Sequence, residues 1–320
     1  KIAPALAAGC SVVCKPANET PLSALALAEL SRRAGIPSGV INILAGKTHE
    51  IGAELTQNPS VRKLTFTGST QVGKLLIEQC AETVKRTSME LGGNAPFIVF
   101  DDAHIDAAVQ GAIVCKFRNA GQTCACANRL MVQDSIYDEF CEKFAAAVSS
   151  LNMGKGQKEG VTIGPLINKD AANDVLTFVE DAVAKGANVV LSGGRSNLGA
   201  CFFEPTILTD VSEGMRVFHE EIFGPVAPVF RFKTDQEAID LANNTAFGLA
   251  CYFYSRDIGR VWRVAEALEY GIVGINEGII SNEMAPFGGI KESGQGKEGS
   301  KYGLNDYLEI KYLCMGGIDT

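Results

Sequence analysis

Two cysteines stand one residue apart in the stretch FRNAGQTCACANR, residues 117–129. Thiols this close, Cys124 and Cys126, could bind a metal, form a disulfide, or consist of one nucleophile and one packed side chain. A zinc site needs about four ligands, usually paired as C-x₂₋₄-C, and the three histidines of the chain lie outside this stretch. We therefore expect no metal here. A permanent disulfide between residues i and i+2 would be strained.

A catalytic thiolate is the remaining chemical role for Cys124, because such a group needs a polar, partly exposed setting that lowers its pKa. Cys124 follows Gln122 and Thr123 on a turn that begins with glycine after a predicted helix, which is such a setting. Two structural cysteines would explain the stretch equally well. The local pattern alone leaves both interpretations open.

Two further segments could carry chemistry. In SMELGGNAP, Glu90 ends a predicted strand and two glycines follow, so it could be a general base beside a ligand that approaches the backbone. A solvated glutamate before a turn explains the same pattern. In FTGSTQVG a strand leads through a turn into a helix near Thr70, and free N–H groups at a helix start suit a phosphate. Such turns occur in any α/β protein, and the spacing is not G-x-G-x-x-G.

The elements that must position these residues are predicted from the alternation of two patterns. Short apolar, β-branched runs predict strands and four-residue periodicity predicts helices between them, which argues for parallel sheets covered by helices. The chain opens in the middle of a helix–strand unit, so we expect it to be the later part of a longer protein. Its last predicted strand, YLEIKYL, has no helix to cover it. The expected strands include residues 11–14, 40–44, 63–66, 96–100, 188–191, 226–232, 248–254 and 271–276.

Composition narrows the class of protein. Of the 320 residues 46% are hydrophobic, and the net charge of −8 disfavours a nucleic-acid partner, which usually meets clustered Lys and Arg. No apolar run approaches the roughly 20 residues that span a bilayer. The ten cysteines are scattered in apolar surroundings, which indicates free thiols in a reducing compartment.

Taken together, the segments resemble the aldehyde dehydrogenase superfamily, from Ala3 to the last predicted strand. The detail of FRNAGQTCACANR, NEGIISNEMAPFGG and GSKYGLNDYLEIKYLC is most similar to the succinate-semialdehyde dehydrogenases. The ordered segments that carry the resemblance are KPAN, FTGSTQVG, MELGGN, FRNAGQTCACANR, EEIFGPV and APFGGIKESG.

The resemblance implies an α/β fold of parallel sheets flanked by helices. Residues 1–90 would form the later part of a Rossmann-type NAD(P)-binding domain, residues 91–290 a catalytic domain with the thiol, and residues 291–320 a return segment with a C-terminal oligomerisation strand. The family's first third, with the Asn of its oxyanion hole, would precede Lys1. We therefore expect the bare 320-residue polypeptide to be inactive.

The resemblance also assigns roles to single residues. Cys124 matches the nucleophile, whose thiolate attacks the aldehyde to form a thiohemiacetal and then a thioester, and Glu90 matches the base that activates water. The positions that match the nucleotide site are Lys15 for the adenosine ribose, Gly68 and Ser69 for the pyrophosphate, and Glu221 and Phe223 for the nicotinamide ribose.

Substrate and cofactor choice follow from three more positions. Arg118 and Ser281 match the arginine and hydroxyl that bind the remote carboxylate of succinic semialdehyde. A cation at a helix C-terminus is the alternative interpretation of Arg118. Asn18 stands where NAD-preferring relatives usually have Glu, and this neutral side chain leaves a 2′-phosphate unrepelled. We expect NADP to be accepted, with NAD as the alternative cofactor.

The resemblance thus implies NAD(P)-dependent oxidation of succinic semialdehyde to succinate in 4-aminobutyrate degradation. Another carboxylated aldehyde, such as glutarate semialdehyde, is the first alternative substrate. A catalytically silent or redox-sensing protein is the second alternative. In this subfamily a cysteine at the position of Cys126 can form a reversible disulfide with the nucleophile, as a redox switch. We expect a homotetramer or homodimer in the cytoplasm or mitochondrial matrix, with no nucleic acid, membrane or metal partner.

Overall fold

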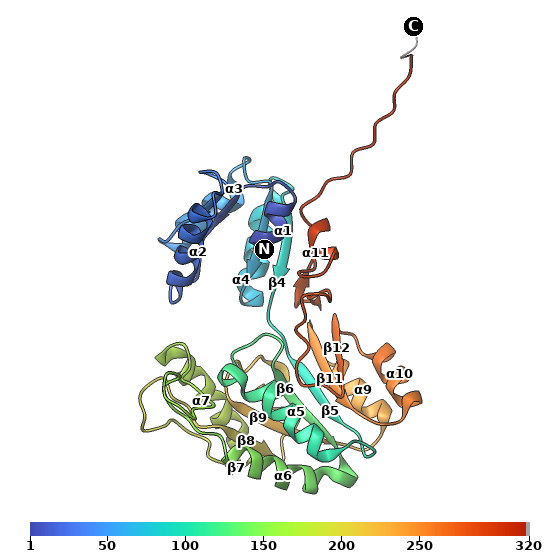
Figure 1. Cartoon of the computed structure of the whole chain (residues 1–320). Coiled ribbons are helices and arrows are strands. Elements are labelled where there is room, and N and C mark those ends of the chain that lie inside the picture. Colours follow the sequence, from blue (N-terminus) through green and yellow to red (C-terminus); the bar gives the residue numbers. More distant parts are fainter. Residues whose placement is uncertain (318–320) are drawn as a thin grey trace.

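The computed structural model describes residues 1–317 and has an upper and a lower half in the view of Figure 1. The upper half contains the elements from α1 to β4, together with α11 (Tyr302–Asn305) near the end of the chain. The lower half contains the large sheet and its helices. The chain therefore returns to the upper half after completing the lower one.

The upper half contains two small sheets. In one, β1 and β2 are parallel; in the other, β4 lies between a parallel β3 and an antiparallel β14. Its strands are β1 (Val12–Cys14), β2 (Ile41–Ile43), β3 (Lys63–Thr67), β4 (Arg86–Glu90) and β14 (Gly294–Gln295). Its helices are α1 (Ile2–Ala7), α2 (Pro21–Arg33), α3 (Thr48–Gln57) and α4 (Thr70–Ala81). Few side chains are buried here, and none in α2.

The lower half is built on a seven-stranded sheet in the order β12-β11-β5-β6-β9-β8-β7, parallel except for the pair β7–β8. All five residues of β5 are buried, as expected for a parallel strand with both faces covered. The strands are β5 (Ala95–Val99), β6 (Ala127–Gln133), β7 (Asn188–Leu191), β8 (Thr206–Thr209), β9 (Val226–Phe232), β11 (Ala250–Tyr254) and β12 (Ile272–Ile275). A small separate ladder pairs β10 (Phe247–Gly248) with β13 (Ile290–Lys291).

Helices cover this sheet, and most of the hydrophobic core lies between them and the strands. The helical segments are α5 (Ile105–Phe117), η1 (Arg118–Gly121), η2 (Asp134–Ile136), α6 (Tyr137–Ser149), α7 (Lys169–Ala184), α8 (Arg216–His219), α9 (Asp235–Asn243) and α10 (Ile258–Ala267). The predicted class, parallel sheets flanked by helices, is confirmed. Each strand given above by its residue range is present, with ends shifted by a few residues at most; the last predicted strand, YLEIKYL, is the exception.

The predicted strand YLEIKYL is wrong for the isolated chain. Residues 308–317 have no regular secondary structure, and Figure 1 shows this segment leading away from the rest of the molecule. A strand needs a neighbouring strand to pair with, and none of the sheets formed by residues 1–317 includes this segment. The rest of the predicted C-terminal segment, residues 318–320, lies outside the described residues.

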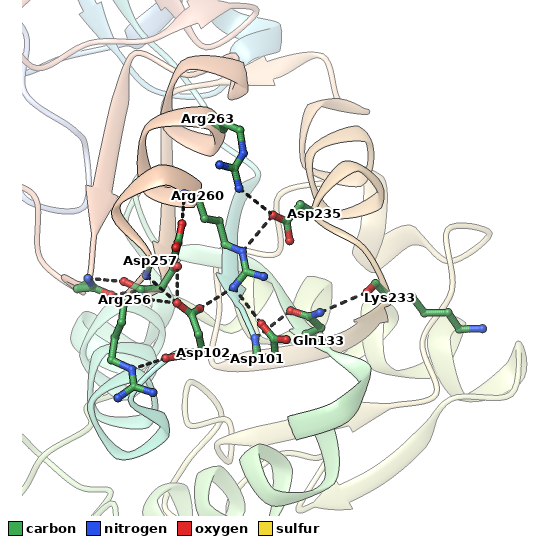
Figure 2. Close-up of polar contacts among 11 residues, drawn as sticks. Asp101, Asp102, Gln133, Lys233, Asp235, Arg256, Asp257, Arg260 and Arg263 are labelled. Carbon is green, nitrogen blue, oxygen red and sulfur yellow. Dashed lines mark hydrogen bonds and ion pairs between the residues drawn. The ribbon is translucent and has the colours of Figure 1, made fainter.

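Charged side chains bind α9 and α10 to the carboxyl ends of the central strands, as Figure 2 shows. The guanidinium of Arg260 lies 2.9 Å from Asp101, 2.7 Å from Asp102 and 3.0 Å from Asp235, and it stacks 4.9 Å above the ring of Phe100. The carboxylate of Asp102 also accepts the backbone N–H groups that follow β11. These contacts fix one end of the sheet, opposite the end described next.

Candidate active site

The stretch that contains Cys124 lies where two neighbouring strands begin. Cys124 precedes β6 and Gly93 precedes β5, and the two strands pair in parallel from Ala95 and Ala127 onward. A Cβ atom on Gly93 would lie 2.3 Å from the carbonyl oxygen of Cys124, so only glycine fits there. Since β4 ends at Glu90, the connection from β4 to β5 brings Glu90 toward the same place.

The turn before Cys124 has an unusual backbone. Asn119, Ala120 and Gly121 have φ angles of 53°, 55° and 76°, so three successive residues adopt the left-handed region. Side chains other than glycine rarely adopt it, at a cost of about 1 kcal/mol each. A Cβ atom on Gly121 would lie 2.2 Å from the carbonyl oxygen of Gly224, which explains why the third of these residues is a glycine. This sharp turn lets α5 lead directly into Cys124.

The thiol of Cys124 is half-buried and held in its protonated form. Burial raises its pKa to about 11, and the negative charges of Glu221 and Glu90 add to the rise. The backbone N–H groups of Cys124 and Ala125 act in the opposite direction, because they donate toward the sulfur. The structure thus brings three predicted residues, Cys124, Glu90 and Glu221, within electrostatic range of one another.

Glu90 is buried, with 4% of its surface exposed, and its Oε2 atom has no hydrogen-bond partner among the described residues. Burial and the negative charge of Glu298 raise its pKa to about 8, against the opposing charges of Lys1 and Lys297. A carboxyl group with a pKa near neutrality and an unpartnered oxygen can exchange a proton with a bound water.

Three charged residues around Glu90 were not predicted from the sequence. The ammonium of Lys1 pairs with Glu298, and Lys297 Nζ donates to the carbonyl oxygens of Gly288 and Gly289 at 2.6 and 3.3 Å. Glu298 and Lys297 lie in the glycine-rich loop GGIKESGQGKEG, which returns to β4 through β14. Their spacing to Glu90 in sequence gives no signal of this contact.

Glu221 connects the loop before β9 to the site. Its Oε1 accepts the N–H of Gly93 at 2.9 Å, and burial raises its pKa to about 7. Phe223, two residues later, is exposed and has a φ of 50°.

Nothing in the sequence points to Asn128, which holds this loop on both sides of Glu221. The Asn128 side chain donates to Glu220 O at 2.9 Å and accepts from Ile222 N at 3.0 Å.

The other residues predicted to bind a nucleotide lie near strand ends of the upper half. Lys15 follows β1, and its Nζ donates to Asn18 Oδ1 at 2.8 Å; the Asn18 amide in turn lies 3.3 Å from Thr48 Oγ1. Ser69 is the N-cap of α4, accepting from Val72 N at 3.4 Å. This exposed set of a cation, hydroxyls and a helix start suits a phosphorylated ribose.

Gly68 joins that set to Glu90. Its N–H donates to Glu90 O at 3.1 Å, so the turn after β3 touches the end of β4. A Cβ atom on Gly68 would lie 2.4 Å from the ring of Phe66. Gly68 is also exposed, so its backbone is accessible to a ligand, as the nucleotide expected from the sequence requires.

Cys126 points away from this surface. Its thiol is buried, and its single S–H has two carbonyl acceptors within reach, Lys116 O at 3.3 Å and Ala127 O at 3.4 Å. All ten cysteines, Cys124 and Cys126 included, are free thiols. A disulfide with Cys124 would require Cys126 to leave both acceptors, so the redox switch stays a prediction.

The two predicted substrate residues are exposed. Arg118 is the C-cap of α5, and among residues 1–317 it forms no ion pair, so its guanidinium is available to an anion. Ser281 lies in the irregular loop between β12 and β13. Substrate binding by Arg118 and Ser281 stays a prediction.

Within 1–317, no three side chains of the His, Cys, Asp and Glu types gather as metal ligands. No helix in that range combines the length and hydropathy needed to cross a membrane.

Comparison with known proteins adds three kinds of match. The model of the aldehyde dehydrogenase family matches residues 1–313. The chain is 63% identical to the 3-sulfolactaldehyde dehydrogenase of Pseudomonas putida over 100% of its own length, and 63% identical to the glutarate-semialdehyde dehydrogenase of Pseudomonas aeruginosa over 99%. It is also 63% identical to the NADP-dependent succinate-semialdehyde dehydrogenase of Escherichia coli, again over 99% of the chain. It spans 66% of the length of each of these relatives.

Among solved structures, the succinate-semialdehyde dehydrogenase of Burkholderia pseudomallei superimposes with a TM-score of 0.98 at 61% identity. The match covers 98% of the present chain and 65% of the other. The architecture described above is therefore the one found in that crystal structure, over nearly the whole of the chain.

Proposed function

The chain belongs to the aldehyde dehydrogenase family, and from this membership we propose that the protein oxidises an aldehyde bearing a remote acid group to the corresponding carboxylic acid. The observation that carries the proposal is the meeting of Cys124, Glu90 and Glu221 at the start of β5 and β6. A thiol, a carboxyl group with a pKa near neutrality and a second carboxylate are the groups that aldehyde oxidation through a thioester needs.

Cys124 acts first in the proposed mechanism. Its thiol loses the proton to a base, and the sulfur attacks the aldehyde carbon, so a C–S bond forms and the carbonyl electrons move to oxygen. The N–H of Cys124 can donate to that oxyanion. Proton transfer from Cys124 to Glu90 is uphill, because the pKa values are about 11 and about 8. Any change that offsets the nearby carboxylate charges therefore favours the thiolate.

We place the nucleotide at the ends of β1 to β4, where the residues around it would be Lys15, Asn18, Gly68 and Ser69. When bound, NAD(P)⁺ supplies the hydride acceptor and a positive charge on the nicotinamide ring. Lys15 and Ser69 would bind and orient the nucleotide, and Glu221 and Phe223 would hold its reactive end near Cys124.

Glu90 completes the reaction. Its carboxylate takes a proton from water, the water oxygen bonds to the thioester carbon, and the C–S bond breaks to release the acid and the Cys124 thiolate. The proton on Glu90 must then leave the buried site. The pair of Lys1 and Glu298 is placed to influence that loss through its charges.

The substrate class follows from what the named substrates of the relatives share. A sulfonate or carboxylate stands at the end remote from the aldehyde in 3-sulfolactaldehyde, glutarate semialdehyde and succinic semialdehyde. Arg118, free of ion pairs in residues 1–317 and close in sequence to Cys124, can bind such an anion together with Ser281. Within this class we propose succinic semialdehyde, from 4-aminobutyrate degradation, as the preferred substrate and glutarate semialdehyde as the alternative.

For the cofactor we propose that NADP is accepted. The neutral Asn18 lies beside the ammonium of Lys15, so a 2′-phosphate would meet a positive charge and no carboxylate from these two side chains. Steady-state kcat/KM of the full-length protein with each nucleotide tests this. A strong preference for NAD would contradict it.

The function itself is tested with the same full-length protein. We expect kcat/KM to be highest with succinic semialdehyde, lower with glutarate semialdehyde and 3-sulfolactaldehyde, and lowest with propanal. Equal rates with propanal would contradict the proposed class of substrate, and absence of acid product would contradict the proposed reaction.

We further propose that the protein is a homodimer or homotetramer in a reducing compartment, the cytoplasm or mitochondrial matrix. The ten free thiols are consistent with a reducing compartment.

A further inference from the structure

Tyr252 contacts the turn that carries Cys124, residues 118–126, which we call the nucleophile turn. Its hydroxyl donates to the carbonyl oxygen of Ala125, the residue after Cys124, at 2.6 Å. Tyr252 belongs to β11, and β5 separates that strand from β6, so the side chain reaches past β5 to the start of β6. It is 2% exposed, and its ring packs against Phe97 of β5 with the centroids 6.0 Å apart.

The Tyr252 hydroxyl supplies the second of two hydrogen bonds that orient the Ala125–Cys126 peptide group. The Ala125–Cys126 peptide donates its N–H to Thr123 O at 3.0 Å and accepts the proton of Tyr252 at its oxygen. The thiol of Cys115 also points at Ala125 O, but at 4.0 Å it is a weak donor. Tyr252 is therefore the strong partner of this buried carbonyl.

The preceding peptide group is confined from the other side. The carbonyl of Cys124 lies so close to Gly93 that a Cβ atom there would be 2.3 Å away. The N–H of this peptide belongs to Ala125, and together with the N–H of Cys124 it points toward the sulfur. The Ala125 N–H therefore lies in the peptide group beside Gly93, and the peptide group that Tyr252 holds follows it directly. The Cys124 N–H belongs to the peptide before them, so its direction depends on the same short turn.

We propose that Tyr252 is a positioning residue for Cys124, and that its hydrogen bond to Ala125 O keeps the sulfur and the surrounding N–H donors aimed at the substrate carbonyl. This rests on the proposed function of Cys124 as nucleophile. Tyr252 touches neither substrate nor cofactor in this role; it acts through the backbone. Burial raises the pKa of the Tyr252 phenol well above its usual value, so the hydroxyl remains a donor throughout the working pH range.

The test is Tyr252→Phe in the full-length protein, with Tyr254→Phe as the matched control. Tyr254 lies two residues along β11 on the same face, is 3% exposed and also packs on Phe97, at 5.2 Å. Its hydroxyl lies against Gly111 rather than the nucleophile turn. Both substitutions remove one oxygen atom from a buried ring, so both variants should fold, which thermal unfolding verifies.

We expect Tyr252→Phe to lower kcat about tenfold or more with KM changed less than about twofold, because small misplacements of a reacting group act on the chemical step. Alkylation of Cys124 by iodoacetamide, located by peptide mass spectrometry, should require a higher pH in this variant, since the N–H donors that lower its pKa are misaligned. Tyr254→Phe should leave kcat and the alkylation profile unchanged.

Unchanged kcat and an unchanged alkylation profile in Tyr252→Phe would overturn the proposal. So would equal effects in the two variants, which would indicate a general packing role. Failure of the underlying function is seen separately: if alkylation of Cys124 in the wild type leaves activity intact, Cys124 is not the nucleophile, whatever Tyr252→Phe does to its alkylation.

Discussion

The protonation of Cys124 depends on a carboxylate contributed by another part of the chain. Glu221 raises the pKa of the thiol through its negative charge, in addition to the effect of burial. Glu221→Gln removes that charge, and we expect the pKa of Cys124 to fall from its value of about 11. Alkylation at Cys124 should then be faster at a given pH above 7, where Glu221 in the wild type carries its charge.

The neighbouring residue provides the control. Glu220 pairs with Arg216 at 2.8 Å on the surface, so Glu220→Gln should leave the alkylation of Cys124 unchanged. Equal acceleration in both variants would contradict a local electrostatic effect of Glu221.

Glu90 determines a second pH dependence. Because its pKa is raised to about 8, the carboxyl is mostly neutral below that pH and becomes the carboxylate base above it. We expect kcat to rise between pH 7 and 9 with the titration of this group, and thioester to accumulate on Cys124 in Glu90→Gln. Initial rates across this range and mass spectrometry of the Cys124 peptide measure the two effects.

Glu298 allows a sharper version of the same experiment. Its negative charge contributes to the raised pKa of Glu90, so Glu298→Gln should move the rise in kcat to lower pH. A shift to higher pH, or none, would show that Glu90 does not control the profile.

Arg118 is tested through its effect on different substrates. We expect Arg118→Ala to raise KM for succinic semialdehyde about tenfold or more, because one charge-assisted contact to the carboxylate is lost. The KM for propanal should change little. Equal changes for the two aldehydes would favour the role of a helix-terminal cation and contradict carboxylate binding.

At the scale of elements, Arg260 connects α10 to α9 and to the end of β5 (Figure 2). Arg260→Ala would leave Asp101, Asp102 and Asp235 facing one another without their shared cation. We expect a loss of about 2 kcal/mol in the free energy of unfolding, since the mostly buried guanidinium is removed from between three partly exposed carboxylates, whose charges are then uncompensated but screened by water. Denaturant unfolding measures it.

Arg263 on the same helix is the control for that loss. Its side chain is 68% exposed and approaches Asp235 only to 3.9 Å, so Arg263→Ala should change stability by less than about 0.5 kcal/mol.

Although burial opposes it, the N–H groups of Arg256 and Asp257 lower the pKa of Asp102. Its contribution to stability is therefore present above the unfolded pKa and should be lost as pH falls below about 4.

At the scale of the whole molecule, the end of the described chain exposes apolar side chains that a soluble surface usually avoids. Ile310 is fully exposed, and Tyr312 and Leu313 are 85% and 72% exposed. A segment of this kind, extended and without a strand partner, suits pairing with the sheet edge of another copy. Deleting residues 308–320 from the full-length protein should reduce its oligomeric state, as light scattering would measure.

A surface substitution elsewhere is the control for that experiment. Met284 is 79% exposed outside this segment, and Met284→Ala should leave the oligomer intact. Retention of the full oligomer after the deletion would contradict the predicted role of the segment.

The local sequence determined the types and order of the elements, because apolar periodicity and turn residues act within a few positions of each other. The buried strands around PFIVF and VAPVFRF and the helix Ile105–Phe117 were predictable for this reason. The ordered motifs also singled out Cys124, Glu90 and Glu221 as candidates. YLEIKYL was not predictable as it stands, since its β-forming pattern needs a partner strand to take effect.

Only the tertiary structure decided which groups surround those candidates. Glu298 lies 208 positions after Glu90 and Tyr252 lies 127 positions after Ala125, yet each acts on its partner at close range. No local pattern encodes such contacts, because they arise when the return loop reaches β4 and when β11 joins β5. The reactivity of Cys124 is therefore a property of its residue type and motif, while its pKa and orientation belong to the fold.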